Sequence, residues 1–357
     1  MRRLGWPLTA LVLSSLLLGL VGCSSSTPAG STSGSGTASG TPDTAKKLKV
    51  GVVFDRGGLG DKSFNDSAWR GIQRAEKELG IEVAKVESKE EKDYETNLMA
   101  MADQGMDLVI AVGLNQGKAL QKVAPDYPDT KFAIVDGQVE APNVRMLKFK
   151  EEEGSFLVGY LAGLMTKTGK VGFVGGMELD LIKKFQYGFA AGVKTARADG
   201  ELLPAKYTGN WDNIDSAKVA ANLLFDSGAD IVYHAAGRAG LGVIRAAEEK
   251  KLWAIGVDSD QDAEAPGFVL TSMVKKVDEA VFATITELSK GEFTAGEKMY
   301  TLADNGVGTS EFTQTKDKIG EANIAKLEEI KAKIVSGEIK VPATEAEYTS
   351  FLETLKK

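Results

Sequence analysis

The side chains that do most covalent chemistry in enzymes are scarce in this chain. It has one histidine, His234, and one cysteine, Cys23. A Ser–His–Asp or Cys–His arrangement has only His234 to use, and this residue lies in an apolar run where a structural role fits better. Zinc sites need clusters of His or Cys. We therefore expect no catalytic residue, no metal and no cofactor.

Polar and aromatic residues gather instead in the stretch GDKSFNDSAWRG (60–71). It follows the apolar run LKVGVVFD (48–55) and precedes a helical pattern, which is a place where many proteins bind phosphate. The stretch has neither Walker A nor GxGxxG spacing. We expect Asp61, Ser63 and Asp66 to shape the turn and start the helix, and Phe64 to stand exposed at its mouth. Asp, Asn, Gly and aromatic residues without a nucleophile favour reversible binding of a polar ligand.

Short apolar runs alternate with amphipathic stretches from residue 46 onward. This alternation predicts parallel strands covered by helices, and hence an α/β fold with two doubly wound sheets in two lobes. The predicted strands occupy 48–54, 81–87, 107–113, 131–137 and 144–149, then 170–176, 230–237, 253–259 and 268–276, with a last one over 298–310. Later helices are predicted over 277–291 and 319–337.

Ligands of open α/β sheets bind outside the carboxyl ends of the strands. We therefore expect the residues that follow the strands to line one cleft, provided that the two sheets face each other. These segments are Phe54–Asn65, Gly113–Gly117, Asp136–Gln138, Gly175–Phe185, Ala236–Gly240 and Val257–Gln261. Trp211 is either a wall of this cleft or a packed surface residue.

The N-terminus resembles a bacterial lipoprotein signal. Arg2 and Arg3 precede an apolar segment over 8–20, and LVGC (20–23) matches a lipobox. The resemblance implies that 1–22 is a signal peptide and that Cys23 is acylated; an ordinary signal peptide with a chance cysteine is the alternative. Residues 23–46 then form the lipidated cysteine and a flexible Ser/Thr/Gly linker. We expect an extracytoplasmic protein held at a lipid bilayer through Cys23.

Seven motifs occur in an order that resembles the basic membrane protein (BMP) family of bacterial lipoproteins, which are substrate-binding proteins of ABC transporters. The resemblance covers about 47–340 and implies a two-lobed type I periplasmic-binding fold with a hinge and a purine nucleoside as ligand. The motifs are DKSFNDSAWRG (61–71), YPDTKFAIVDG (127–137), EEGSFLVGYLAG (152–163), VGFVGG (171–176), FQYGFAAG (185–192), IGVDSDQ (255–261) and TSMVKKVDEAV (271–281).

The same resemblance implies roles for residues around the base. Two aromatic rings hold the purine in this family, and they fall on Phe64 and Phe185. The base-reading carboxylate falls on Asp55. A base-reading amide falls near Asn115, with its neighbours as alternatives because the motif around it is loose.

The resemblance also implies roles around the ribose. The family's ribose-holding carboxylate falls on Asp258, and Gly237 matches a glycine whose small size lets the ribose approach. The family's lysine falls on Lys275, with Lys276 as the competing register. A carboxylate can accept from both hydroxyls of a cis-diol, and such charge-assisted hydrogen bonds are strong.

These observations predict a lipid-anchored receptor that delivers guanosine, adenosine or inosine to an ABC permease. There are three alternatives: a receptor for another polar ligand such as a sugar, a nucleoside-processing enzyme at the surface, and a signalling or adhesion lipoprotein with a vestigial cleft. The net charge of −7 gives no footprint for nucleic acid, and we expect a monomer. The N-terminal lobe is predicted over 47–150, completed by about 268–340; the C-terminal lobe over 151–267; and a helical tail over 341–357.

Overall fold

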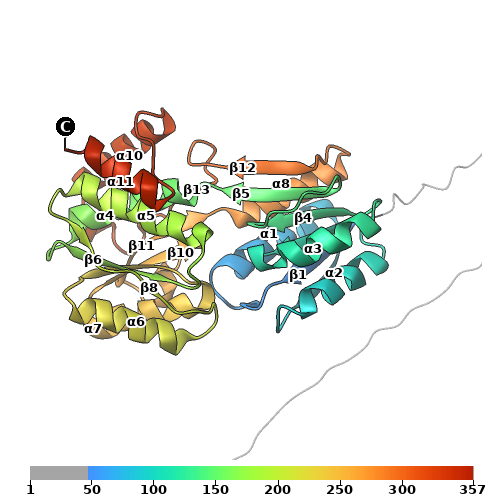
Figure 1. Cartoon of the computed structure of the whole chain (residues 1–357), viewed down its shortest axis with the longest axis horizontal. Helices are drawn as coiled ribbons and strands as arrows, with labels where there is room; N and C mark the ends of the chain where they lie inside the picture. The colour runs from blue at the N-terminus through green and yellow to red at the C-terminus, as the bar shows by residue number, and fades with distance from the viewer. Residues whose placement is uncertain (1–46, 357) are drawn as a thin grey trace, which may run out of the picture. The chain divides into compact units, whose positions relative to one another are not determined.

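A computed structural model describes residues 47–356 of the protein. The predicted signal peptide 1–22, Cys23 and the linker 23–46 lie outside these described residues. The described chain forms two lobes, each with its own β-sheet between layers of helices (Figure 1). The predicted α/β class with two sheets of parallel strands is confirmed.

The first lobe is built on a six-stranded sheet of order β12-β5-β4-β3-β1-β2, in which every neighbouring pair is parallel. The strands are β1 (Lys49–Phe54), β2 (Glu82–Glu87), β3 (Leu108–Val112), β4 (Lys131–Val135), β5 (Val144–Phe149) and β12 (Gly296–Tyr300). The helices are α1 (Phe64–Leu79), α2 (Asp93–Asp103), α3 (Gly117–Val123) and α8 (Val277–Ser289), with 3-10 turns at Leu114–Gln116 and Ala124–Asp126.

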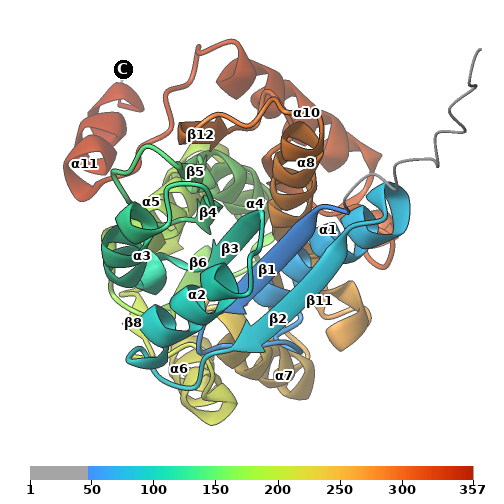
Figure 2. The same ribbon diagram turned by 90° about the vertical axis from the view of Figure 1, so that its right-hand side faces the viewer.

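Alternate residues of β1 enter different cores because successive side chains of a strand point to opposite faces. Val52 packs in the core that contains Ile72 of α1, whereas Val53 packs in the core that contains Leu98 of α2. The sheet is therefore covered by α1 and α8 on one face and by α2 and α3 on the other (Figure 2). Near-continuous apolar strands are what a parallel sheet buried on both faces requires.

The second lobe is built on a seven-stranded sheet of order β13-β11-β10-β9-β6-β7, with β8 also paired to β6. Only β13 runs antiparallel to its neighbour. The strands are β6 (Lys170–Gly175), β7 (Glu201–Leu202), β8 (Lys206–Tyr207), β9 (Ile231–Ala235), β10 (Trp253–Asp258), β11 (Val269–Lys275) and β13 (Val307–Thr309).

Two helix layers also cover the second sheet, with α4 and α5 on one face and α6 and α7 on the other (Figure 1). The helices are α4 (Glu151–Met165), α5 (Asp180–Ala196), α6 (Ile214–Asp226), α7 (Leu241–Lys250), α9 (Lys316–Ile319), α10 (Glu321–Val335) and α11 (Glu345–Thr354), with 3-10 turns at Gly237–Gly240 and Asp262–Glu264. No helix in the described part of the chain is both long enough and apolar enough to cross a membrane.

The lobes are joined where β5 leads into α4, where β11 leads into α8, and between β12 and β13. The prediction that about 268–340 completes the first lobe is wrong for most of that segment, because only α8 and β12 return to it. β11 pairs with β10 in the second sheet, and nearly all of its residues are buried there. α10 places Leu327, Ile330 and Ile334 in the core beneath α4.

Two further boundaries differ from the prediction. The strand expected over 298–310 is two strands in different sheets, because the chain turns at Asn305, whose φ is +58°. The predicted tail over 341–357 contains α11, which packs on α5 through Tyr348 stacked on Tyr187, with ring centroids 5.8 Å apart. The C-terminal tail therefore belongs to the second lobe.

Candidate ligand-binding site

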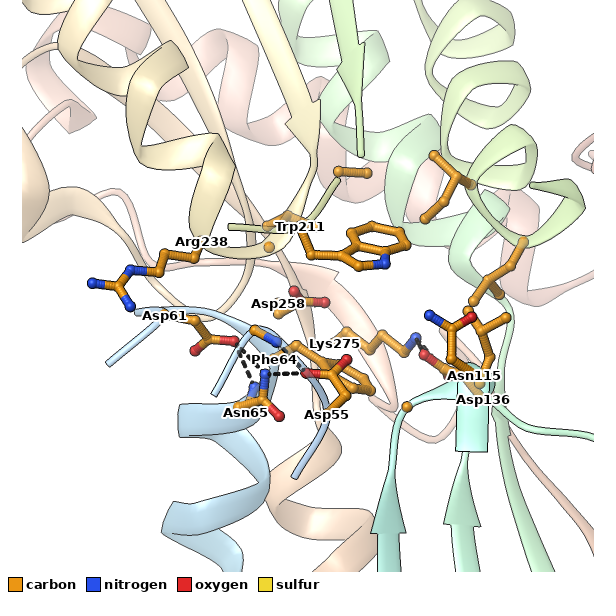
Figure 3. A pocket seen from close by; sticks show the side chains of 18 of the residues that line it. Asp55, Asp61, Phe64, Asn65, Asn115, Asp136, Trp211, Arg238, Asp258 and Lys275 are labelled. Atoms are coloured by element: carbon orange, nitrogen blue, oxygen red, sulfur yellow. Dashed lines mark hydrogen bonds and ion pairs between the residues drawn. The ribbon is translucent and has the colours of Figure 1, made fainter. Parts of the chain in front are cut away.

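The carboxyl ends of strands from both sheets meet around one cavity (Figure 3). Its empty space is about 630 Å³, a figure that includes space open to solvent. All seven predicted ligand-binding residues line it: Asp55, Phe64, Asn115, Phe185, Gly237, Asp258 and Lys275. Trp211 lines it as well, so it is a wall of the cavity.

The turn before α1 is organised by Asp61, which is 1% exposed. Its carboxylate accepts from the backbone N–H groups of Ser63, Asn65 and Asp66 at 2.8–3.1 Å, and from the Asn65 side chain at 3.0 Å. Asp66 in turn accepts from the backbone of Gly60 at 2.8 Å and Lys62 at 3.0 Å. This network holds Phe64 at the first position of α1, where it lines the cavity.

Ser63 starts α1 as the sequence predicts, but its side chain has a different partner from the one expected of a cap. It occupies the N-cap position of α1, but its side chain makes no capping hydrogen bond. Its hydroxyl donates instead to Asp258 of the second lobe at 2.5 Å. A turn residue thus becomes a contact between the lobes.

Asp55 follows β1 and presents one carboxylate oxygen to the cavity. Its Oδ1 accepts from Gly57 N at 2.9 Å and from Asn65 Nδ2 at 2.9 Å. A Cβ on Gly113 would lie 2.8 Å from the other oxygen, so a glycine is needed here, and its φ is +114°. Burial raises the pKa of Asp55 to about 6, although the hydrogen bond from Asn65 lowers it in part.

The two aromatic residues come from opposite lobes: Phe64 begins α1 and Phe185 lies on α5. The ammonium of Lys275 lies 5.4 Å from the ring centroid of Phe64 and 5.8 Å from that of Phe185. Phe185 is only 3% exposed. The cavity therefore has an aromatic surface from each lobe near one buried cation.

Lys275 is the centre of a buried ion cluster. Its Nζ lies 2.7 Å from both carboxylate oxygens of Asp136 and 3.0 Å from Glu151 Oε1. Glu151 also pairs with Lys184 at 3.2 Å. Burial by itself would lower the pKa of Lys275, but these carboxylates outweigh it and raise that pKa, so the lysine stays charged. Lys276 is exposed, and it is Lys275 that lines the cavity.

Asp258 ends β10 with φ +63°, a conformation that costs energy for any residue but glycine. Its side chain is buried beside the cavity. Burial raises the pKa of Asp258 to about 7, although Lys275 and the Ser63 hydrogen bond both lower it. Strained backbone and raised carboxylate pKa values cluster at functional sites, so Asp258 is a candidate for a functional residue.

The opposite wall comes from two loops of the second lobe. The indole of Trp211 lies against Gly176, where a Cβ would approach the ring to 2.4 Å. Gly237 has φ +55° and lines the cavity next to Trp211. Arg238 stands at the rim, exposed, with its guanidinium pointing away from Trp211 and Lys275 (Figure 3).

For some residues that line the cavity the sequence predicts no contact with the ligand. Asp136 is the most important of them, because it pairs with Lys275 and is 9% exposed. It falls in a strand-end segment that the topology rule singles out, but nothing in its motif tells a ligand contact from a structural ion pair. The others are Gly57, Asp61, Asn65, Gly113, Leu114, Leu181, Ile182, Ala235, Arg238 and Val257.

His234 lies outside the residues that line the cavity. It is fully buried, and its Nε2 lies 3.0 Å from Gln261 Oε1. Burial lowers the pKa of His234 to about 4, so it is neutral at pH 7. Among residues 47–356 no group of three His, Cys, Asp or Glu side chains is arranged to hold a metal ion.

Comparison with known proteins identifies the family. Residues 48–345 match the family model described as "ABC transporter substrate-binding protein PnrA-like", named Bmp. The chain belongs to the Bmp family. The relationship that its motifs suggest is therefore confirmed, and the two-lobed fold is that of this family's periplasmic-binding type.

Relatives of this Bmp-family chain carry several names. It is 36% identical to the CD4+ T-cell-stimulating antigen of Listeria innocua, over 96% of this chain and 98% of that protein. It is 34% identical to the ABC transporter nucleoside-binding protein BmpA of Lactococcus lactis, over 86% and 92%. The crystal structure of an ABC transporter solute-binding protein from Aeropyrum pernix superimposes with a TM-score of 0.79 at 30% identity, over 87% of this chain and 97% of that one.

Proposed function

We propose that this Bmp-family protein captures a purine nucleoside between its lobes and delivers it to an ABC permease. The observation that carries the proposal is the cavity itself, which is lined by carboxylates and by aromatic side chains from both lobes, namely Phe64 from the first and Phe185 and Trp211 from the second. A flat base would stack between Phe64 and Phe185, where stacking contributes about 1–3 kcal/mol per base. The nucleoside-binding name of the Lactococcus lactis relative supports the same ligand class.

The base would be recognised at the first-lobe end of the cavity. Asp55 has an oxygen available beyond those used by Gly57 and Asn65, and it can accept from a ring N–H or an exocyclic amine. Asn115, in the 3-10 turn after β3, lines the same end and offers both a donor and an acceptor. Its neighbour Gln116 is committed elsewhere, because its amide donates to the backbone of Val53 and Val112.

The ribose would be held at the second-lobe end. Asp258 would accept from sugar hydroxyls, and Gly237 would leave room for the ring. The Lys275 ammonium would lie near a sugar oxygen while it is shared with Asp136 and Glu151. Buried carboxylates outnumber the single buried lysine around the cavity, so an uncharged ligand is favoured over a phosphorylated one. Two aromatic surfaces favour a nucleoside over a free sugar.

The protein would work outside the cytoplasm as a monomer, attached to the bilayer through acyl chains on Cys23. Each buried CH₂ group of such a chain contributes about 0.8 kcal/mol, so two or three chains anchor a protein stably. No reaction is proposed for the cavity, because an Asp- and Phe-lined site without a nucleophile is suited to reversible binding. Hinge closure around the ligand is the expected conformational step.

Mass spectrometry of small molecules released from the purified, denatured protein tests the ligand. We expect a purine nucleoside in near-equimolar amount, and a sugar or amino acid in its place would refute the proposal. Incubation with inosine tests the absence of turnover. Appearance of free hypoxanthine above a trace would indicate a nucleoside-processing enzyme.

A further inference from the structure

A second set of contacts joins the lobes beside the cavity. Two residues of the first-lobe turn, Lys62 and Ser63, contact the segment 257–261, which contains the end of β10 and the turn after it. Ser259 Oγ donates to the carbonyl of Ser63 at 3.0 Å, and Gln261 Nε2 donates to the carbonyl of Lys62 at 3.1 Å. Ser63 is fully buried in this contact.

The Ser63 hydroxyl has one hydrogen to donate, and the geometry decides where it goes. Its oxygen lies 2.5 Å from Asp258 Oδ2 but 3.4 Å from the carbonyl oxygen of Val257. The Ser63 hydroxyl therefore donates its hydrogen bond to the Asp258 carboxylate. This contact fixes Oδ2 and leaves Oδ1 of Asp258 for the cavity.

We propose that Ser63 is a positioning residue, which orients the Asp258 carboxylate for the ligand and does so only while the two lobes are together. The inference rests on the proposed function in one respect, namely that Asp258 contacts the ligand. Ser63 belongs to the first lobe and Asp258 to the second, so separation of the lobes removes this hydrogen bond. A ligand that needs an oriented Asp258 thereby favours the closed arrangement.

Several charged and titratable groups face Asp258 and set its pKa together with the Ser63 hydroxyl. Lys275 of β11 favours the ionised carboxylate, whereas Asp61 of the turn and Asp136 after β4 oppose it, and Tyr233 of β9 is a neutral neighbour. The Ser63 hydrogen bond lowers the pKa of Asp258. Removing the hydroxyl therefore raises the pH at which this carboxylate loses its proton.

The test compares Ser63→Ala with Ser63→Thr, which keeps a hydroxyl. Ser67→Ala is the matched control, since Ser67 is a fully buried serine of the same helix whose hydroxyl accepts only from Asp278 N within the first lobe. Inosine, guanosine and adenosine affinities are measured by calorimetry from pH 5 to 9. Protonation of Asp258 is followed by infrared spectroscopy in nucleoside-saturated proteins, whose lobes are together, and in ligand-free proteins, with Asp258→Asn to assign its band.

We expect Ser63→Ala to weaken nucleoside binding at pH 7 by about tenfold, as for loss of a hydrogen bond to a charged group. The acid limb of binding and the infrared midpoint should both move to higher pH, while Ser63→Thr and Ser67→Ala resemble the wild type. Unchanged affinity, or weaker binding with an unmoved midpoint, would overturn the proposal. If wild-type protein binds no nucleoside, the proposed function fails, whereas a higher infrared midpoint in ligand-free Ser63→Ala still supports the Ser63–Asp258 hydrogen bond and an unmoved midpoint counts against it in the arrangement of this structure. If Ser63→Ala does not fold, Ser63→Gly replaces it with the same criteria.

Discussion

Replacement of Lys275 by methionine tests the buried ion cluster without reference to any ligand. Lys275 is 1% exposed, and its ammonium is shared by Asp136 and Glu151, which are buried too. Methionine has a similar length but no charge, so the variant leaves Asp136 buried without its ion-pair partner and Glu151 with Lys184 in place of two lysines. Breaking a buried pair by removing one member costs about 3–5 kcal/mol. That is a large share of the roughly 5–15 kcal/mol that stabilises a typical protein.

The loss of stability in Lys275→Met should depend on pH, because the protonation of Asp136 changes. Burial already raises the pKa of Asp136, and Lys275 opposes that rise. In Lys275→Met the opposition is gone, so the Asp136 carboxyl takes up a proton more readily and its burial then costs less. The loss of unfolding free energy should therefore be largest near pH 8 and smaller near pH 5.

Urea unfolding of ligand-free protein at pH 8 and pH 5 measures both effects. Lys276→Met is the matched control, because Lys276 is exposed and should change stability by less than about 1 kcal/mol. Three outcomes would refute the reasoning: a loss in Lys275→Met of under about 1 kcal/mol at pH 8, an equal loss at both pH values, or an equal loss in Lys276→Met.

Three other predictions concern the cavity and the anchor. Phe185→Ala and Asp258→Ala should each raise the nucleoside Kd at least about tenfold in calorimetry, and unchanged values in both would remove the site assignment. The pKa values of about 6 for Asp55 and about 7 for Asp258 lie above those of unfolded carboxyls, so ligand-free protein should gain stability in thermal unfolding as the pH falls from 8 to 6.5. Below pH 6.5 this gain is opposed by His234, because burial lowers its pKa to about 4. A melting temperature that does not change between pH 8 and pH 6.5 would contradict the assignment. Cys23→Ser should move the protein from the membrane fraction to the soluble fraction, and continued membrane association would argue against acylation.

Much of the fold follows from local patterns. Apolar runs buried on both faces predict parallel strands, and all the runs assigned to the first sheet from 48 to 149 are strands of that sheet. Lobe membership of the later segments does not follow, because it depends on which strand a segment pairs with. The apolar pattern of β11 is compatible with either sheet, and only its pairing with β10 decides.

The site was predictable to a similar degree. The strand-end rule places Asp55, Asp258 and Asp136 at one edge, and all three line the cavity. Whether one of these carboxylates also contacts a distant protein group depends on the tertiary structure, which the strand-end rule does not predict. Ser63 and its partner Asp258 are 195 residues apart in the chain, and a serine before a helix is ordinarily read as an N-cap.

Calorimetric titration of ligand-free protein with inosine, guanosine, adenosine and ribose tests the central claim most directly. We predict saturable binding of at least one nucleoside, no detectable binding of ribose alone, and at least about tenfold weaker nucleoside binding in Phe64→Ala, where one stacking surface is lost. Absence of heat with every nucleoside, or an unchanged affinity in Phe64→Ala, would contradict the account.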